Sequence, residues 1–116
     1  MKDAELVAVG SRSVDRARGF AERFGIEQAH SYDTFFDAGL DAIYLATPHA
    51  QHTDLALRAV AAGIPVLVEK SFTATLAGSQ EVVDAARAKG VFAMEAMWTR
   101  FLPVIAAARE VVAWGR

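Results

Sequence analysis

The chain has 116 residues, of which 53% are hydrophobic and 22% charged, so it suits one globular domain with a single core and not a disordered protein. Its formal net charge is −2, and its 12 basic residues are scattered along the chain, which argues against nucleic-acid binding. Because it has no cysteine, no H-x-x-x-H pair and no apolar run near the roughly 20 residues that span a bilayer, we expect no disulfide, no metal centre, no membrane association and a cytoplasmic location.

The first expected elements are a strand and the helix that follows it. Residues 6–9 form a short apolar run, which predicts a strand. Ser13 can cap a helix that Gly25 would end. The apolar positions of this helix share one face: Val14, Ala17, Ala21 and Phe24. Residues 32–38 then predict a short helix or turn capped by Asp33.

Three further strands are expected along the chain. Residues 42–46 read AIYLA and predict the second strand, which Pro48 ends because proline cannot donate to a sheet ladder. A helix over residues 53–62 follows it. Residues 66–68 and 91–94 predict the third and fourth strands.

Two more helices complete the pattern. Thr75 can begin a helix that ends near Gly90. The last helix, over residues 103–113, has Pro103 in its first turn and needs a surface to pack on. Its apolar positions share one face: Val104, Ile105, Ala108, Val111 and Val112. The alternation of strands and helices predicts an α/β fold with a doubly wound parallel sheet, similar to a Rossmann fold.

The residues that follow the predicted strands are the candidate site. In open parallel sheets, ligands bind beyond the carboxyl ends of the strands, and here those positions are polar. They are Gly10, Ser11 and Arg12 after the first strand, Thr47, Pro48, His49 and His52 after the second, Glu69 and Lys70 after the third, and residues 95–100 after the fourth. We therefore expect four strand ends to converge on one edge.

The motifs at these strand ends resemble the Gfo/Idh/MocA oxidoreductases. Marks of that family are a T-P-x-x-x-H turn, an E-K-P turn and a cofactor-binding Rossmann domain; this chain has TPHAQH at 47–52 and EKS at 69–71. The stretch MEAMWTRF at 94–101 is similar to the branch that contains dimeric dihydrodiol dehydrogenases and NADP-dependent D-xylose dehydrogenases. The resemblance implies hydride transfer between NADP and a sugar or cyclic diol, and a homo-oligomer in the full-length protein.

The resemblance also implies roles for particular residues. Lys70 would be the central catalytic residue, whose amine passes a proton to or from the substrate oxygen as hydride moves. Glu69 would accept a hydrogen bond from a cofactor ribose hydroxyl. Thr47 and Pro48 would let the backbone approach the cofactor. Two further residues, Trp98 and Arg100, would border the nicotinamide and substrate pocket.

The expected cofactor and the roles of the two histidines are inferred from the chemistry of the residues themselves. Arg12 follows the strand that presents a group to the adenosine ribose in dinucleotide folds, and a guanidinium suits the 2′-phosphate of NADP where an acid would select NAD. Ser11 and Arg12 therefore favour NADP over NAD. His52 holds its turn by bonding backbone, or else transfers a proton; we favour the first, and His49 stays open.

Each assignment has a plainer alternative. Lys70 and Arg12 can be solvated side chains, Glu69 a surface ion pair, the Thr47 turn a simple strand stop and Trp98 a packing residue. The whole chain can be a non-catalytic nucleotide-binding or regulatory domain, or a structural fragment that associates through an exposed sheet edge.

The sequence departs from the family pattern at three points. The first strand with its G-x-G-x-x-G turn and the C-terminal α+β domain have no counterpart in this sequence. We therefore expect residues 1–116 to form a partial NAD(P)-binding domain, with helix 103–113 leading toward a second domain, and we expect this chain alone to be inactive. Ser71 stands where the family usually has proline, which should loosen the placement of Lys70.

Overall fold

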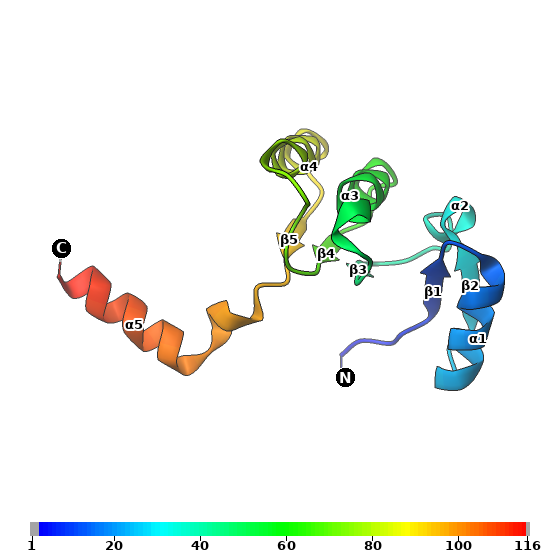
Figure 1. The fold of residues 1–116 in the computed structure, drawn as a ribbon, viewed down its shortest axis with the longest axis horizontal. Helices are drawn as coiled ribbons and strands as arrows, with labels where there is room; N and C mark the ends of the chain where they lie inside the picture. Colours follow the sequence, from blue (N-terminus) through cyan, green and yellow to red (C-terminus); the bar gives the residue numbers. More distant parts are fainter. Residues whose placement is uncertain (1–2, 116) are drawn as a thin grey trace.

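The computed structural model describes residues 3–115 and forms an α/β fold with five parallel strands in two sheets (Figure 1). Its first unit contains β1 (Ala8–Ser11), α1 (Val14–Phe24), β2 (Gln28–Ser31) and α2 (Tyr32–Phe35). The two strands pair in parallel, and α1 packs against both. The predicted parallel α/β architecture is thereby confirmed.

Helix α1 has the ends that its sequence predicts. The Ser13 side chain accepts a hydrogen bond from the Arg16 N–H, and Gly25 ends the helix with a φ of 67°. The predicted apolar face is only partly buried, because Phe24 is 55% exposed and its ring lies against Phe20 on the surface.

The second unit carries the larger sheet. Its elements are β3 (Ile43–Leu45), the 3-10 turn η1 (His49–Gln51), α3 (His52–Ala61), β4 (Val66–Val68), α4 (Leu76–Lys89) and β5 (Ala93–Glu95). The strands pair in parallel in the order β3-β4-β5. Helices α3 and α4 lie side by side over one face of this sheet (Figure 1). Thr75 caps α4 through the Gly78 N–H, as predicted, and Gly90 ends it.

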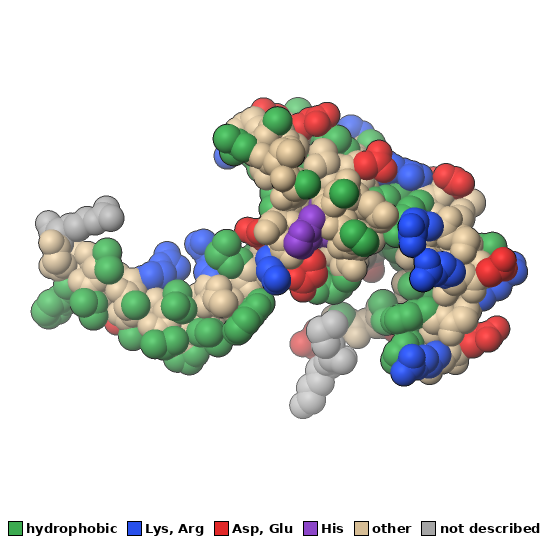
Figure 2. All heavy atoms as spheres, in the orientation of Figure 1, with side chains coloured by type: hydrophobic (Ala, Val, Ile, Leu, Met, Phe, Trp, Pro, Cys, Tyr) green, Lys and Arg blue, Asp and Glu red, His purple; other side chains and the backbone are tan. Residues whose placement is uncertain are grey.

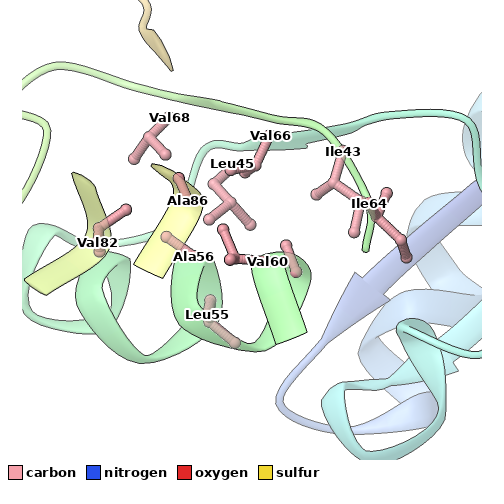
Figure 3. Packing of buried hydrophobic residues seen from close by; sticks show 11 residues of the cluster. Ile43, Leu45, Leu55, Ala56, Val60, Ile64, Val66, Val68, Val82 and Ala86 are labelled. Atoms are coloured by element: carbon pink, nitrogen blue, oxygen red, sulfur yellow. The ribbon is translucent and has the colours of Figure 1, made fainter. Parts of the chain in front are cut away.

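The hydrophobic core lies between the β3-β4-β5 sheet and these two helices (Figure 3). Alternate strand residues face the helices, and the buried cluster is Ile43, Leu45, Leu55, Ala56, Ala59, Val60, Ile64, Val66, Val68, Val82 and Ala86. The opposite face is open, since Tyr44 is 56% exposed and Leu67 36% exposed. The sheet therefore has one packed face among the described residues.

The chain ends in η2 (Trp98–Phe101) and α5 (Pro103–Trp114), which project away from both sheets (Figure 1). No residue of α5 is buried, and hydrophobic side chains cover much of the projecting arm at the lower left of Figure 2. Helix α5 has the predicted period, and the described residues supply no surface that covers it. None of the helices between residues 3 and 115 is both long and apolar enough to cross a membrane.

Several sequence predictions about the elements were wrong. Strand β2 was not predicted, because its sequence QAHS contains no apolar run, yet it pairs with β1 along its whole length. Strand β1 begins two residues later than expected, and Ser31, not Asp33, occupies the N-cap of α2. The strands also form two sheets, so the end of β1 does not share a sheet edge with the ends of the other three predicted strands.

Candidate active site

The ends of β3, β4 and β5 lie next to one another and form the candidate site. Main-chain hydrogen bonds continue past the strands: the Glu69 N–H donates to the Leu45 oxygen at 2.9 Å, and the Ala96 N–H donates to the Val68 oxygen at 2.7 Å. The turns that follow the three strands are thereby held side by side. The predicted convergence is confirmed for these three strand ends.

The turn after β4 contains Lys70, and its backbone is held by side chains from the turn after β3. His49 Nε2 lies 3.0 Å from the Lys70 carbonyl oxygen and 3.3 Å from the Ser71 nitrogen. His52 Nδ1 lies 2.9 Å from the Ser71 carbonyl oxygen. The peptide bond between Lys70 and Ser71 is cis. The N–H and the carbonyl oxygen of Ser71 thus each lie beside a histidine side chain. This differs from the loosened turn that we expected from the absence of proline.

His52 is fully buried and ties two turns together. Its Nε2 lies 2.8 Å from the Thr47 carbonyl oxygen, while its Nδ1 faces Ser71. His52 therefore lies between the turn after β3 and the turn after β4, and a neutral ring donates its single N–H to one of these two carbonyl oxygens. This geometry supports the turn-holding interpretation of His52 over a role in proton transfer.

A third side chain holds the same turn from β5. The Phe72 N–H donates to Glu95 Oε1 at 2.8 Å. Glu95 was part of the stretch compared with the family, but no role was assigned to it from the sequence. The sequence feature that could have indicated this role is the position of Glu95 at a strand end, where a carboxylate can reach the neighbouring turn.

The Glu69 carboxylate is oriented by two donors. Its Oε1 accepts from the Tyr44 hydroxyl, and its Oε2 accepts from the Lys70 N–H at 2.9 Å. The Tyr44 hydrogen bond, followed by the Lys70 N–H, lowers the pKa of Glu69, because both stabilise the ionised carboxylate. The same bond raises the pKa of the Tyr44 phenol, with burial and the Glu69 charge adding to it. Tyr44 was missed because it reads as an ordinary aromatic strand residue.

Lys70 is exposed at the end of β4. Within the described residues, its ammonium takes part in no hydrogen bond or ion pair. The Lys70 N–H donates to Glu69, and His49 Nε2 lies within hydrogen-bond distance of the peptide group that follows Lys70. The backbone that carries the Lys70 side chain is therefore held in place, while the amine has no partner among the described residues.

Thr47 carries a feature that fits a bound ligand. Its hydroxyl oxygen is buried and has no hydrogen-bond partner among the described residues. Buried polar groups are nearly always paired, so this hydroxyl suits a ligand atom placed beside the end of β3. The neighbouring Pro48 is exposed and follows β3, which ends at Leu45, one residue earlier than predicted.

The remaining predicted site residues lie at or after the ends of β1 and β5. Ser11 ends β1 in the smaller sheet and Arg12 follows it; Arg12 is exposed and forms no ion pair within residues 3–115. Trp98 is 62% exposed in η2, which argues against a packing role in the described chain. Arg100 lines a hollow of about 320 Å³ together with Met94, Glu95 and Met97.

The comparisons with known proteins point in one direction. The chain is 42% identical over 113 residues to trans-1,2-dihydrobenzene-1,2-diol dehydrogenase from Mus musculus, covering 96% of this chain and 34% of that protein. It is 41% identical to D-xylose 1-dehydrogenase (NADP(+)) from Hypocrea jecorina, covering 96% of this chain and 30% of that protein. The chain thus spans about a third of the length of these curated relatives.

Solved structures agree. An NAD binding oxidoreductase from Klebsiella pneumoniae superposes with a TM-score of 0.84 at 28% identity, over 96% of this chain and 30% of that one. A 3-ketoreductase from Actinomadura kijaniata in complex with NADP and TDP-benzene superposes with a TM-score of 0.82 at 31% identity, over 96% of this chain and 34% of that one. The profile described as oxidoreductase family, NAD-binding Rossmann fold, matches residues 1–97. The chain therefore belongs to the Gfo/Idh/MocA oxidoreductase family.

Proposed function

We propose that this chain is the nucleotide-binding part of an NADP-dependent oxidoreductase that acts on a hydroxyl or carbonyl group of a sugar or cyclic diol. The two curated relatives described above carry names of that class, and the matching ketoreductase was solved with NADP. In this proposal residues 1–116 belong to one domain, α5 leads toward a second domain, and the whole protein is a cytoplasmic homo-oligomer.

The observation that carries the proposal is the placement of Lys70. Its N–H is bound by Glu69 and the peptide group after it is contacted by His49, whereas its ammonium is unpaired within the described chain. A lysine kept only for solubility does not need its backbone held in this way. A lysine whose backbone is held in place and whose amine is unpaired suits a catalytic group that has to approach the substrate oxygen in one geometry.

Lys70 would move the proton of the reaction. When a hydroxyl is oxidised, the C–H hydrogen leaves as hydride, the C–O bond becomes a carbonyl, and the hydroxyl proton passes to the neutral Lys70 amine. In the reverse direction the Lys70 ammonium donates that proton to the oxygen. NADP, when bound, supplies the hydride acceptor or donor.

Other residues would hold the cofactor. The Arg12 guanidinium and Ser11 hydroxyl suit the 2′-phosphate, and the oriented Glu69 carboxylate suits a ribose hydroxyl. The backbone at Pro48 would let the cofactor approach, and the Thr47 hydroxyl, which is unpaired among the described residues, supports a ligand atom beside it. Trp98 and Arg100 would border the substrate pocket, and His52 would act indirectly by holding the turns.

The test is an assay of the full-length protein with NADP and a panel of sugars and cyclic diols. The proposal expects absorbance at the reduced-nicotinamide wavelength to rise with at least one substrate. Tight NADP binding without turnover on any sugar or diol would favour the non-catalytic nucleotide-binding domain instead. Light scattering of the same sample reports the oligomeric state.

A further inference from the structure

One nitrogen of His49 lies between the two polar atoms of a single peptide group. Nε2 is 3.0 Å from the Lys70 oxygen and 3.3 Å from the Ser71 nitrogen, so it can bind either side of the peptide that follows Lys70. The ring is also packed edge-on against the buried His52, with ring centroids 5.4 Å apart.

The two contacts require opposite states of that nitrogen. An imidazole nitrogen that carries a hydrogen donates to the Lys70 oxygen, and one that carries a lone pair accepts from the Ser71 N–H. Only one of the two bonds exists at a time. In either neutral tautomer, however, His49 still binds the same peptide group.

The second contact depends on the residue at position 71. Ser71 has a backbone N–H to donate, whereas a proline there would have none. With proline, the lone-pair tautomer of His49 would lose its partner. Ser71 thus lets both tautomers of His49 hold the turn.

We propose that His49 is a positioning residue that holds the Lys70–Ser71 peptide in both of its tautomers, and that this double contact replaces the restraint of a proline ring at position 71. The catalytic consequence rests on the function proposed above, but the contact itself does not.

The first test reads the contact without any activity. In the ¹⁵N-labelled protein, ring nitrogen shifts report how much of each histidine tautomer is present. Ser71→Pro should shift His49 toward the tautomer with hydrogen on Nε2 and leave His30 unchanged. His30 is the matched control, because its ring nitrogens face Gln28 and Thr34 and its ring lies near Phe35, all of them on β2 and α2. An unchanged His49 ring in a folded Ser71→Pro protein overturns the proposal.

A second measurement decides the matter if Ser71→Pro does not fold. His49→Ala should speed hydrogen exchange of the Ser71 amide by about tenfold, the loss expected for one hydrogen bond. His49→Gln should keep most of the protection, because its amide can donate to Lys70 and accept from Ser71. Equal Ser71 exchange in His49→Ala and the unaltered protein overturns the proposal.

Kinetics then test the positioning role. In the full-length enzyme, His49→Ala should lower kcat about tenfold with NADP affinity changed less than about twofold, and His49→Gln should recover most of the loss. If Lys70→Met abolishes turnover but His49→Ala has full kcat, the positioning role is refuted and the proposed function stands. If Lys70→Met has no effect, the proposed function fails, and the ring shifts still decide whether the contact exists.

Discussion

The Tyr44 hydroxyl on β3 donates a hydrogen bond to the Glu69 carboxylate at the end of the neighbouring strand β4. Tyr44 lies on the open face of the sheet, and Glu69 directly precedes Lys70. The bond fixes one carboxylate oxygen while the Lys70 N–H fixes the other. A partly exposed glutamate is thereby given one orientation before any ligand binds, which reduces the entropy that binding would cost.

Tyr44→Phe should raise the pKa of Glu69 toward its ordinary value. The Tyr44 hydrogen bond is the largest cause of the lowered pKa, and the remaining Lys70 N–H should keep part of the shift. Because the folded pKa is the lower one, the stability linked to Glu69 is present above the unfolded value of about 4.3 and is lost as pH falls through the folded value. Carboxyl ¹³C titration of the labelled protein measures the change.

Tyr32→Phe is the control for that titration, since Tyr32 contacts Gln51 and not Glu69. An identical Glu69 titration in Tyr44→Phe and in the unaltered protein would show that the hydroxyl does not hold the carboxylate. The Tyr44 phenol itself should titrate above its usual range, so its contribution to stability is present below about pH 10 and is lost as pH rises through the folded value.

The predictable parts of this structure are those whose signal is local. Val66–Val68 reads as a strand because its three residues are all apolar, and Thr75 and Gly90 have the chemistry of helix ends. Gln28–Ser31 gives no such signal, because its pairing with Ala8–Ser11 and the packing of α1 make it a strand. Contacts with segments distant in the sequence, and not local propensity, therefore determine that these residues form a strand.

The candidate site shows the same division. Strand-end position alone was enough to predict that Thr47, His52 and Lys70 would come together. The parts played by Tyr44 and Glu95 depend on side chains that reach across neighbouring strands, which the spacing along one strand does not reveal. The loosening expected from Ser71 was likewise not what the structure showed, because the partners of its backbone come from another turn.

Leu55→Ala should destabilise the chain by about 2 to 5 kcal/mol, because truncating a buried leucine loses transfer free energy and leaves a cavity. Leu55 is 2% exposed in α3, within the core of Figure 3. Leu76→Ala is the matched control, since Leu76 is 86% exposed and its loss should cost about 0.5 kcal/mol or less. Urea unfolding of both variants measures the difference, and equal midpoints would contradict the observed core.

Arg12→Ala should remove most of the preference for NADP over NAD. In the full-length protein we expect NADP to bind at least about tenfold better than NAD, and losing one charge-assisted contact should cost about 1 to 3 kcal/mol. Calorimetric titration with both nucleotides measures this. Arg16→Ala, one turn into α1, should leave the ratio unchanged. Equal affinity of the unaltered protein for NADP and NAD would refute the assignment of Arg12.

The most direct test of the account is steady-state kinetics of Lys70→Met in the full-length enzyme across about pH 6 to 10, with NADP affinity measured separately by fluorescence. Turnover should fall by about 100-fold or more while NADP affinity changes little, because the phosphate and ribose contacts belong to other residues. Lys70→Arg should rescue poorly, since a guanidinium does not give up its proton in this range. Lys89→Met is the control, as the Lys89 ammonium donates to the Ala61 carbonyl oxygen, far along the chain from the strand ends of the candidate site. Near-normal turnover of Lys70→Met would contradict the account and leave Lys70 as a solvated lysine at a strand end.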